Sequence, residues 1–245
     1  MSLVDPGSKA QQADADPTFG PLYRIGGVAA ALMVAVTLLH SGVFFVVGLP
    51  SNIVEWFELF ESNALSGLLA FELLLVIYVI LSVPVVLALY AALRRTRPSL
   101  MSIYMALGLI GIVAFVASRP AFEMLALSNG YAAATTDAQR AAYLAAGEAA
   151  LAVFDGTAFW VSYVLGSLSG LAISAVILQS AVFSRTTAYL RLASSVLDFG
   201  LFVPTIGLFI ALLSVFCLLG FNILVARRLL QLGRAGPIDV DHGDA

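Results

Sequence analysis

The sequence of 245 residues is poor in charge, cysteine and histidine. Charged side chains make up 11%, against about 25% in an ordinary soluble domain. With an isoelectric point near 5.3 there is no basic face for nucleic acid. One cysteine, Cys217, excludes a disulfide framework. The two histidines, His40 and His242, have no partners at zinc-ligand spacing, so the sequence predicts no metal site.

Motifs of soluble enzymes are also missing. There is no HExxH, no Walker A loop and no GxGxxG turn. The run at 166–170 is GSLSG, with Leu168 where a nucleophile elbow needs serine. We therefore expect no catalytic residue, no cofactor and no nucleotide-driven activity from this chain alone.

Apolar residues, in contrast, reach 61%, and the mean hydropathy is +1.00. A bilayer-spanning helix needs about 20 mostly apolar residues, and backbone groups in lipid must pair within the segment. The sequence predicts an all-α polytopic membrane protein, a bundle of six transmembrane helices within 21–234 together with an external amphipathic helix. The predicted spans are 25–48, 65–93, 99–118, 157–181, 187–203 and 205–226.

Lys and Arg set the orientation, because cytoplasmic loops carry them in excess. With the N-terminus inside, the external side holds only Arg119 and Arg140. The other ten fall inside: Lys9, Arg24, Arg94, Arg95, Arg97, Arg185, Arg191, Arg227, Arg228 and Arg234. Both termini are therefore predicted to be cytoplasmic, with the polar tails 1–20 and 235–245 disordered.

The segment 119–156 is predicted to lie outside. Its run 137–154 is too short and too polar, with Glu148 in the middle, to be another span. Thr136 followed by Gln139 matches a capping box, so we expect a helix outside the bilayer core. A second interfacial helix is expected at 51–62, where aromatic and acidic residues mix.

Three ionisable residues fall in the outer halves of predicted spans: His40, Glu72 and Asp198. They lie about 12, 10 and 8 Å from the outer helix ends. Because charge in lipid is costly, they predict one outward polar pocket, with Arg119 reaching it and Tyr163 lining it. A purely structural polar network is the alternative. If Arg119 pairs with Glu72, then Asp198 becomes the titrating group and His40 its expected partner.

Several segments resemble a bacterial family of membrane proteins, the domain-of-unknown-function family forty-three eighty-six. The resemblance runs from about Leu22 to Arg234, and the segments that carry it are 118–125, 132–140, 147–148, 156–159, 163–167 and 203–207. It implies a compact multi-helix protein of the bacterial plasma (inner) membrane. It implies no activity, ligand or site residue.

Two functions remain open, with a lipid-modifying enzyme a weaker third. The first is a small transporter that uses the outward pocket, working as a homodimer because six helices are few. The second is a non-enzymatic partner or sensor protein acting through 119–156. Gly166 and Gly170 form a GxxxG-type face, expected to pack within the chain or in a dimer. Beyond the lipid bilayer, the sequence identifies no ligand.

The topology predicts a labelling pattern for single cysteines introduced at positions 98, 140 and 240. Positions 98 and 240 should react with a membrane-impermeant reagent from the cytoplasmic side, and position 140 only from outside. Cytoplasmic labelling of position 140 would refute the topology.

Overall fold

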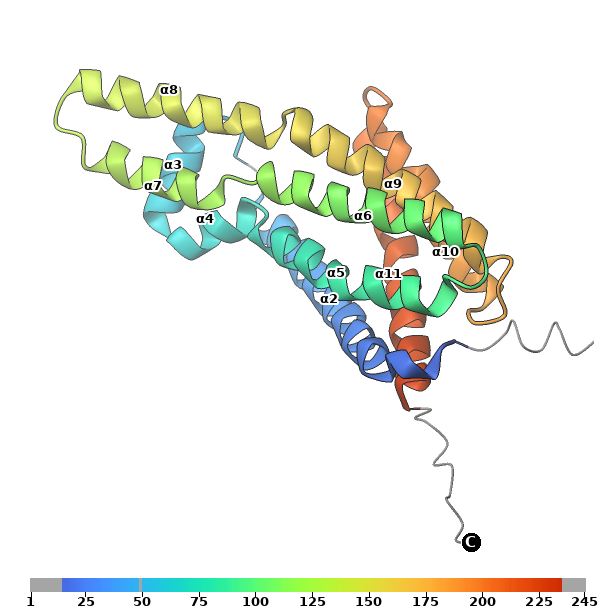
Figure 1. The fold of residues 1–245 in the computed structure, drawn as a ribbon. Coiled ribbons are helices and arrows are strands. Elements are labelled where there is room, and N and C mark those ends of the chain that lie inside the picture. Colours follow the sequence, from blue (N-terminus) through green and yellow to red (C-terminus); the bar gives the residue numbers. More distant parts are fainter. Residues whose placement is uncertain (1–14, 49, 235–245) are drawn as a thin grey trace, which may run out of the picture. The chain divides into compact units, whose positions relative to one another are not determined.

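The computed structural model describes residues 15–48 and 50–234, and these are helical or in turns, with no strand among them (Figure 1). The chain divides into two compact units. The first contains residues up to 34, 81–110 and from 164 onward. The second contains 35–80 and 111–163.

The first unit is made of three separate stretches of the chain. It holds η1 (Pro17–Phe19), α10 (Arg185–Asp198), η2 (Phe199–Phe202) and α11 (Gly207–Arg234). It also holds parts of α2 (Gly20–Val47), α5 (Leu73–Leu93), α6 (Pro98–Ala117) and α9 (Thr157–Ile177). The second unit holds the remaining parts of those four helices with α3 (Ile53–Ser62), α4 (Ala64–Ala70), α7 (Ala121–Ala132) and α8 (Asp137–Phe154).

Among the described residues, five helical stretches are long and apolar enough to cross a membrane: Pro17–Val47, Leu73–Leu93, Pro98–Ala132, Asp137–Ile177 and Phe209–Arg234. Each coincides with one of the predicted spans over most of that span. The remaining predicted span, 187–203, corresponds to α10 and η2, and α10 alone has 14 residues. The predicted count of six stays a prediction.

One predicted span is wrong as a single helix. The stretch 65–93 is two helices, because α4 ends at Ala70 and α5 begins at Leu73. Glu72 between them has φ 63°, a left-handed conformation that ends a regular helix. Pro84 lies inside the uninterrupted α5 and does not coincide with the break.

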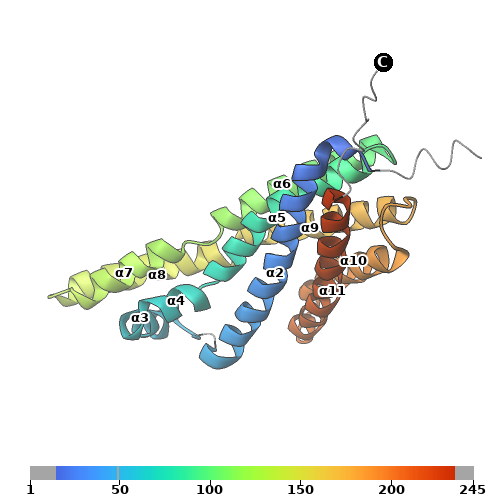
Figure 2. The same cartoon turned by 90° about the horizontal axis from the view of Figure 1, so that it is seen from below.

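Within the first unit, α10 and α11 run side by side in both views (Figures 1 and 2). Helix α9 meets α10 at Gly170, where an added Cβ would strike Arg191 and Ser195. Arg191 also donates from Nη2 to the Gly166 carbonyl at 3.1 Å. The Gly170 half of the GxxxG-type face therefore packs within the chain, whereas a Cβ added at Gly166 would meet no atom within 4 Å among the described residues. A dimer through this face stays a prediction.

Arginine side chains connect several helix ends within the first unit. Arg24 near the start of α2 donates to the Gly233 carbonyl at the end of α11, at 2.7 Å. Asp16, the N-cap of η1, pairs with Arg94 and Arg95 beyond the end of α5, at 3.2 and 2.8 Å. The start of α2 and the ends of α5 and α11 thus lie at one end of this unit.

The tail predictions need one adjustment. Residues 16–20 of the predicted tail 1–20 form the capped η1 and the start of α2, because Asp16 accepts from Thr18 and binds the two arginines. Residues 1–14 and the predicted tail 235–245 lie outside the described residues.

The second unit has its own aromatic core, which joins α3, α4, α7 and α8. Phe71 is fully buried and its ring meets Trp56 at 4.9 Å and Phe154 at 4.6 Å. Helix α8 begins at the capping box of Thr136 and Gln139, as the sequence predicted. It reaches α3 at Gly147, where any Cβ would strike Ile53. The predicted helix at 51–62 is confirmed as α3, capped by Asn52. The position of these helices outside a bilayer stays a prediction.

The Asp16 carboxylate should make the stability of the folded protein depend on pH in the acid range. The Thr18 hydroxyl, helped by Arg95 and Arg94, holds the pKa of the Asp16 carboxyl below its ordinary 3.8. A depressed folded-state pKa means that this stabilisation is complete above pH 3.8 and is lost as the pH falls further. We expect Asp16→Asn to lower the midpoint of thermal unfolding at pH 7, and this difference from the native chain should shrink as the pH falls below 3.8.

The matched control is Asp137→Asn, at the exposed first turn of α8. It should not reproduce this pH-dependent difference. A deficit of Asp16→Asn that persists unchanged at pH 2 would contradict the assignment.

Candidate functional site

The one candidate site whose groups the structure brings together surrounds Arg119, in the second unit. Arg119 follows the end of α6, in the short turn before α7. Its side chain is only 1% exposed. A buried guanidinium needs both a counter-charge and acceptors for its N–H groups, since desolvation would otherwise be prohibitive.

Both requirements are met by neighbouring groups. Nε donates to Glu72 Oε2 at 2.6 Å. Nη1 donates to the Phe154 carbonyl and to Ser118 Oγ, each at 2.9 Å. The charge of Asp155, which ends α8, also acts on the pair. Arg119 therefore connects three parts of the second unit: its own turn after α6, the end of α8 and the break between α4 and α5.

Aromatic rings enclose the guanidinium. Its carbon lies 4.4 Å from the ring centroid of Phe115, 4.2 Å from that of Phe154 and 4.7 Å from that of Phe159. These distances are within cation–π range, which in a desolvated site contributes about 2 kcal/mol. The rings come from α6, α8 and α9, so the enclosure depends on helices from distant parts of the sequence.

Glu72 differs from its partner in exposure. Its side chain is 23% exposed, whereas that of Arg119 is sealed. Its carbonyl accepts from Leu75 and Val76, so it sits at the N-terminal end of α5 where negative charge is favoured. Oε2 is held by Arg119, and within the described residues no protein donor meets Oε1. The site therefore presents one oriented carboxylate oxygen.

The prediction that Arg119 lies near Glu72 or Asp198 is confirmed for Glu72, and the depth of Glu72 in a bilayer stays a prediction. Tyr163 adjoins the same cluster, because its ring lies 5.7 Å from that of Phe159. His40, near the end of α2, has a buried Nδ1 with no hydrogen-bond partner among the described residues. It belongs to the same unit as Glu72.

Asp198 belongs to the other unit, so a single pocket shared with Glu72 stays a prediction. Within its own unit, Asp198 is within reach of the charge of Arg191, and the nearby Ser214 hydroxyl donates to the Ala211 carbonyl at 2.7 Å. The cation that acts on Asp198 is Arg191, which the sequence argument had assigned only to orientation. His40 as its partner stays untested.

The aromatic enclosure was missed by sequence reasoning. Phe115, Phe154 and Phe159 are ordinary residues in apolar runs, and only their closeness to an external arginine in the sequence could have indicated it. Among the described residues, no three His, Cys, Asp or Glu side chains gather as a metal ion requires. The groups present suit binding of a cation or proton at Glu72.

Comparison with family models, curated proteins and solved structures finds no match for this chain. The resemblance to family forty-three eighty-six therefore stays a prediction.

Removing the counter-charge should destabilise the second unit. We expect Glu72→Gln to lower the unfolding free energy of the detergent-solubilised protein by about 3–5 kcal/mol, because Arg119 is left buried and unpaired. Glu58→Gln removes the same charge from an exposed position of α3 and should change stability by less than about 0.5 kcal/mol. Asp198→Asn should also be nearly neutral. Equal effects of Glu72→Gln and Glu58→Gln would show that the pair has no structural role.

Proposed function

We propose that the chain is a bacterial plasma-membrane protein with six spans and both termini in the cytoplasm. Support comes from the first unit, where the start of α2 and the end of α11 meet through Arg24 and Gly233. If the first and last membrane helices have these ends on the same side of the bilayer, the chain must cross the bilayer an even number of times. Helix α10 with η2 is about 29 Å long, close to the bilayer core of about 30 Å, and supplies the sixth.

The proposed external segment is α7 with α8. The apolar stretches Pro98–Ala132 and Asp137–Ile177 have 35 and 41 residues, whereas a bilayer accommodates about 20. The residues in excess of about 20 lie next to the turn at 133–136, at the end of the first stretch and the start of the second. The α7–α8 pair is therefore the part that projects beyond the bilayer.

We propose further that the protein is a small transporter whose Glu72 carboxylate binds a proton or a cationic group. The observation that carries this is the geometry of the pair: Arg119 is sealed, whereas Glu72 is accessible and has one oxygen unbonded among the described residues. A structural ion pair alone would not need to leave its carboxylate open.

The helix break supports the same function. Transporters often place substrate or ion sites where a membrane helix is discontinuous, because the break frees polar groups within the apolar layer. Glu72 occupies such a break, in a left-handed conformation that costs about 1–3 kcal/mol. Arg119 fixes the carboxylate through a 2.6 Å bond to Oε2, and three rings surround its guanidinium. Since six helices are few, we propose that the working form is a homodimer.

A charge-balanced double variant tests this function without leaving a buried charge. Glu72→Gln combined with Arg119→Gln removes both charges but keeps polar side chains, so the fold should be retained. In proteoliposomes with an internal pH dye and an imposed potential, the native protein should move protons or a monovalent cation. The double variant should lose at least tenfold of this flux.

The matched control is Glu58→Gln with Arg140→Gln, which removes one charge of each sign from exposed positions of the same unit. It should carry native flux. Native flux in the Glu72 and Arg119 double variant, or no flux in the native protein, would overturn the transporter proposal. The partner or sensor function through α7 and α8 would then be the better explanation.

A further inference from the structure

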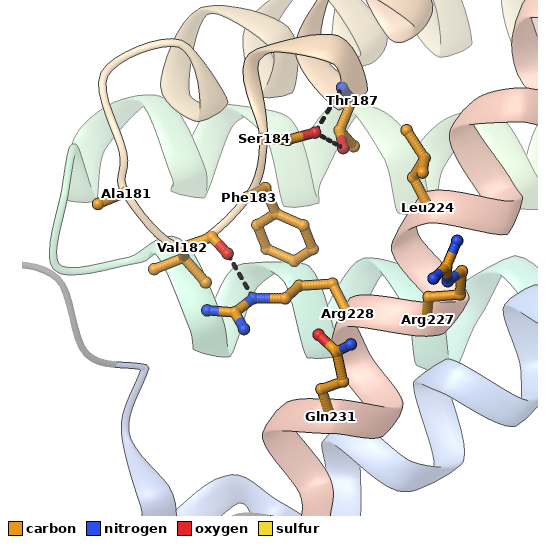
Figure 3. A pocket seen from close by; sticks show the side chains of 9 residues that line it. All are labelled: Ala181, Val182, Phe183, Ser184, Thr187, Leu224, Arg227, Arg228 and Gln231. Atoms are coloured by element: carbon orange, nitrogen blue, oxygen red, sulfur yellow. Dashed lines mark hydrogen bonds between the residues drawn. The ribbon is translucent and has the colours of Figure 1, made fainter.

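A second polar site lies in the first unit, far in sequence from Glu72. It is an open cleft of about 450 Å³ between the 181–187 segment and the last third of α11 (Figure 3). Its volume lies within the range of small-molecule sites, about 300–1,000 Å³. Nothing in the proposed transport site uses it.

The lining combines two arginines with neutral polar groups and has no acidic residue. Arg227, Arg228 and Gln231 come from α11, and Ser184 and Thr187 come from the start of α10. The ion pairs of the described residues involve Arg94, Arg95 and Arg119, so neither cleft arginine is neutralised by a carboxylate there. The cleft therefore carries uncompensated positive charge.

Arg228 is held in place. Its Nε donates to the Val182 carbonyl at 2.6 Å, and Figure 3 shows the side chain reaching from α11 to the loop. This bond uses one edge of the guanidinium and leaves both terminal nitrogens without a protein acceptor among the described residues. A guanidinium fixed in this way is pre-organised to donate two bonds to a phosphate.

We propose that this cleft binds a phosphate group of a singly or doubly charged anion. Two arginines, a glutamine amide and the one hydroxyl hydrogen that the Ser184–Thr187 bond leaves over supply donors for several phosphate oxygens. The phosphate can come from an anionic lipid headgroup or from a small phosphate compound. Apolar Val182, Phe183 and Leu224 in the same lining favour the lipid, since they offer contact for its glycerol and acyl carbons.

The position of the cleft along the chain agrees with this ligand. Basic pockets at the cytoplasmic ends of membrane helices typically bind anionic headgroups. Arg227 and Arg228 stand near the end of α11, at the end of the unit where Arg24 meets Gly233. This is the end that the positive-inside rule assigns to the cytoplasm.

Binding can be measured on the full chain in a neutral detergent. Phosphatidylglycerol, phosphatidylcholine and inorganic phosphate are titrated separately, and the shift in thermal unfolding gives each dissociation constant. We expect phosphatidylglycerol to bind at least tenfold more tightly than phosphatidylcholine. Arg227→Gln, which breaks no hydrogen bond within the described residues, should weaken this binding about tenfold, as expected for a lost charge-assisted bond.

Arg234→Gln is the matched control, because it removes the same charge from an exposed residue of the same helix outside the cleft. It should change affinity less than twofold. Arg228→Lys keeps the charge but removes the two terminal guanidinium nitrogens that can bind phosphate together, so it should weaken binding as well. Binding of phosphatidylglycerol without inorganic phosphate identifies a lipid site, and binding of inorganic phosphate identifies a small-molecule site. If neither binds, or if Arg234→Gln weakens binding as much as Arg227→Gln, the proposal is wrong.

Discussion

A guanidinium in an apolar interior must receive a counter-charge and hydrogen-bond acceptors, and the second unit is arranged around this requirement. Arg119 lies in the turn between α6 and α7, with its side chain 1% exposed. Glu72 supplies the charge, and the end of α8 supplies a carbonyl at 2.9 Å. Both groups lie where a helix ends or breaks: Glu72 lies between α4 and α5, and Phe154 is the last residue of α8, where a carbonyl has no acceptor role within the helix.

The same constraint links stability to the proposed function. Arg119 is enclosed by three rings, and Glu72 is the member of the pair that is partly exposed. A ligand that binds the Glu72 carboxylate therefore changes the Glu72–Arg119 interaction at the helix break. In the first unit Arg191 of α10 donates to the Gly166 carbonyl of α9, and its charge acts on Asp198. Each unit thus contains an arginine that joins separate helices.

Local signals in the sequence predicted the parts of the fold that depend on local physics. The capping box at Thr136 and Gln139 started α8 at the expected residue, and long apolar runs marked the long helices. The pairing of Glu72 with Arg119 followed from the cost of burying either charge alone. The break in 65–93 could not be predicted, because Glu72 sits in an apolar run and its left-handed conformation is stabilised by an arginine 47 residues away. The aromatic enclosure likewise depends on tertiary packing of three helices.

The central claim is that Glu72 and Arg119 are energetically coupled, and a double-mutant cycle measures that coupling directly. Unfolding free energies of the detergent-solubilised native protein, Glu72→Gln, Arg119→Gln and the double variant give the interaction term. The buried pair predicts a coupling of about 2–3 kcal/mol, with the double variant more stable than Glu72→Gln alone. A coupling below about 0.5 kcal/mol, with additive single effects, would contradict the account.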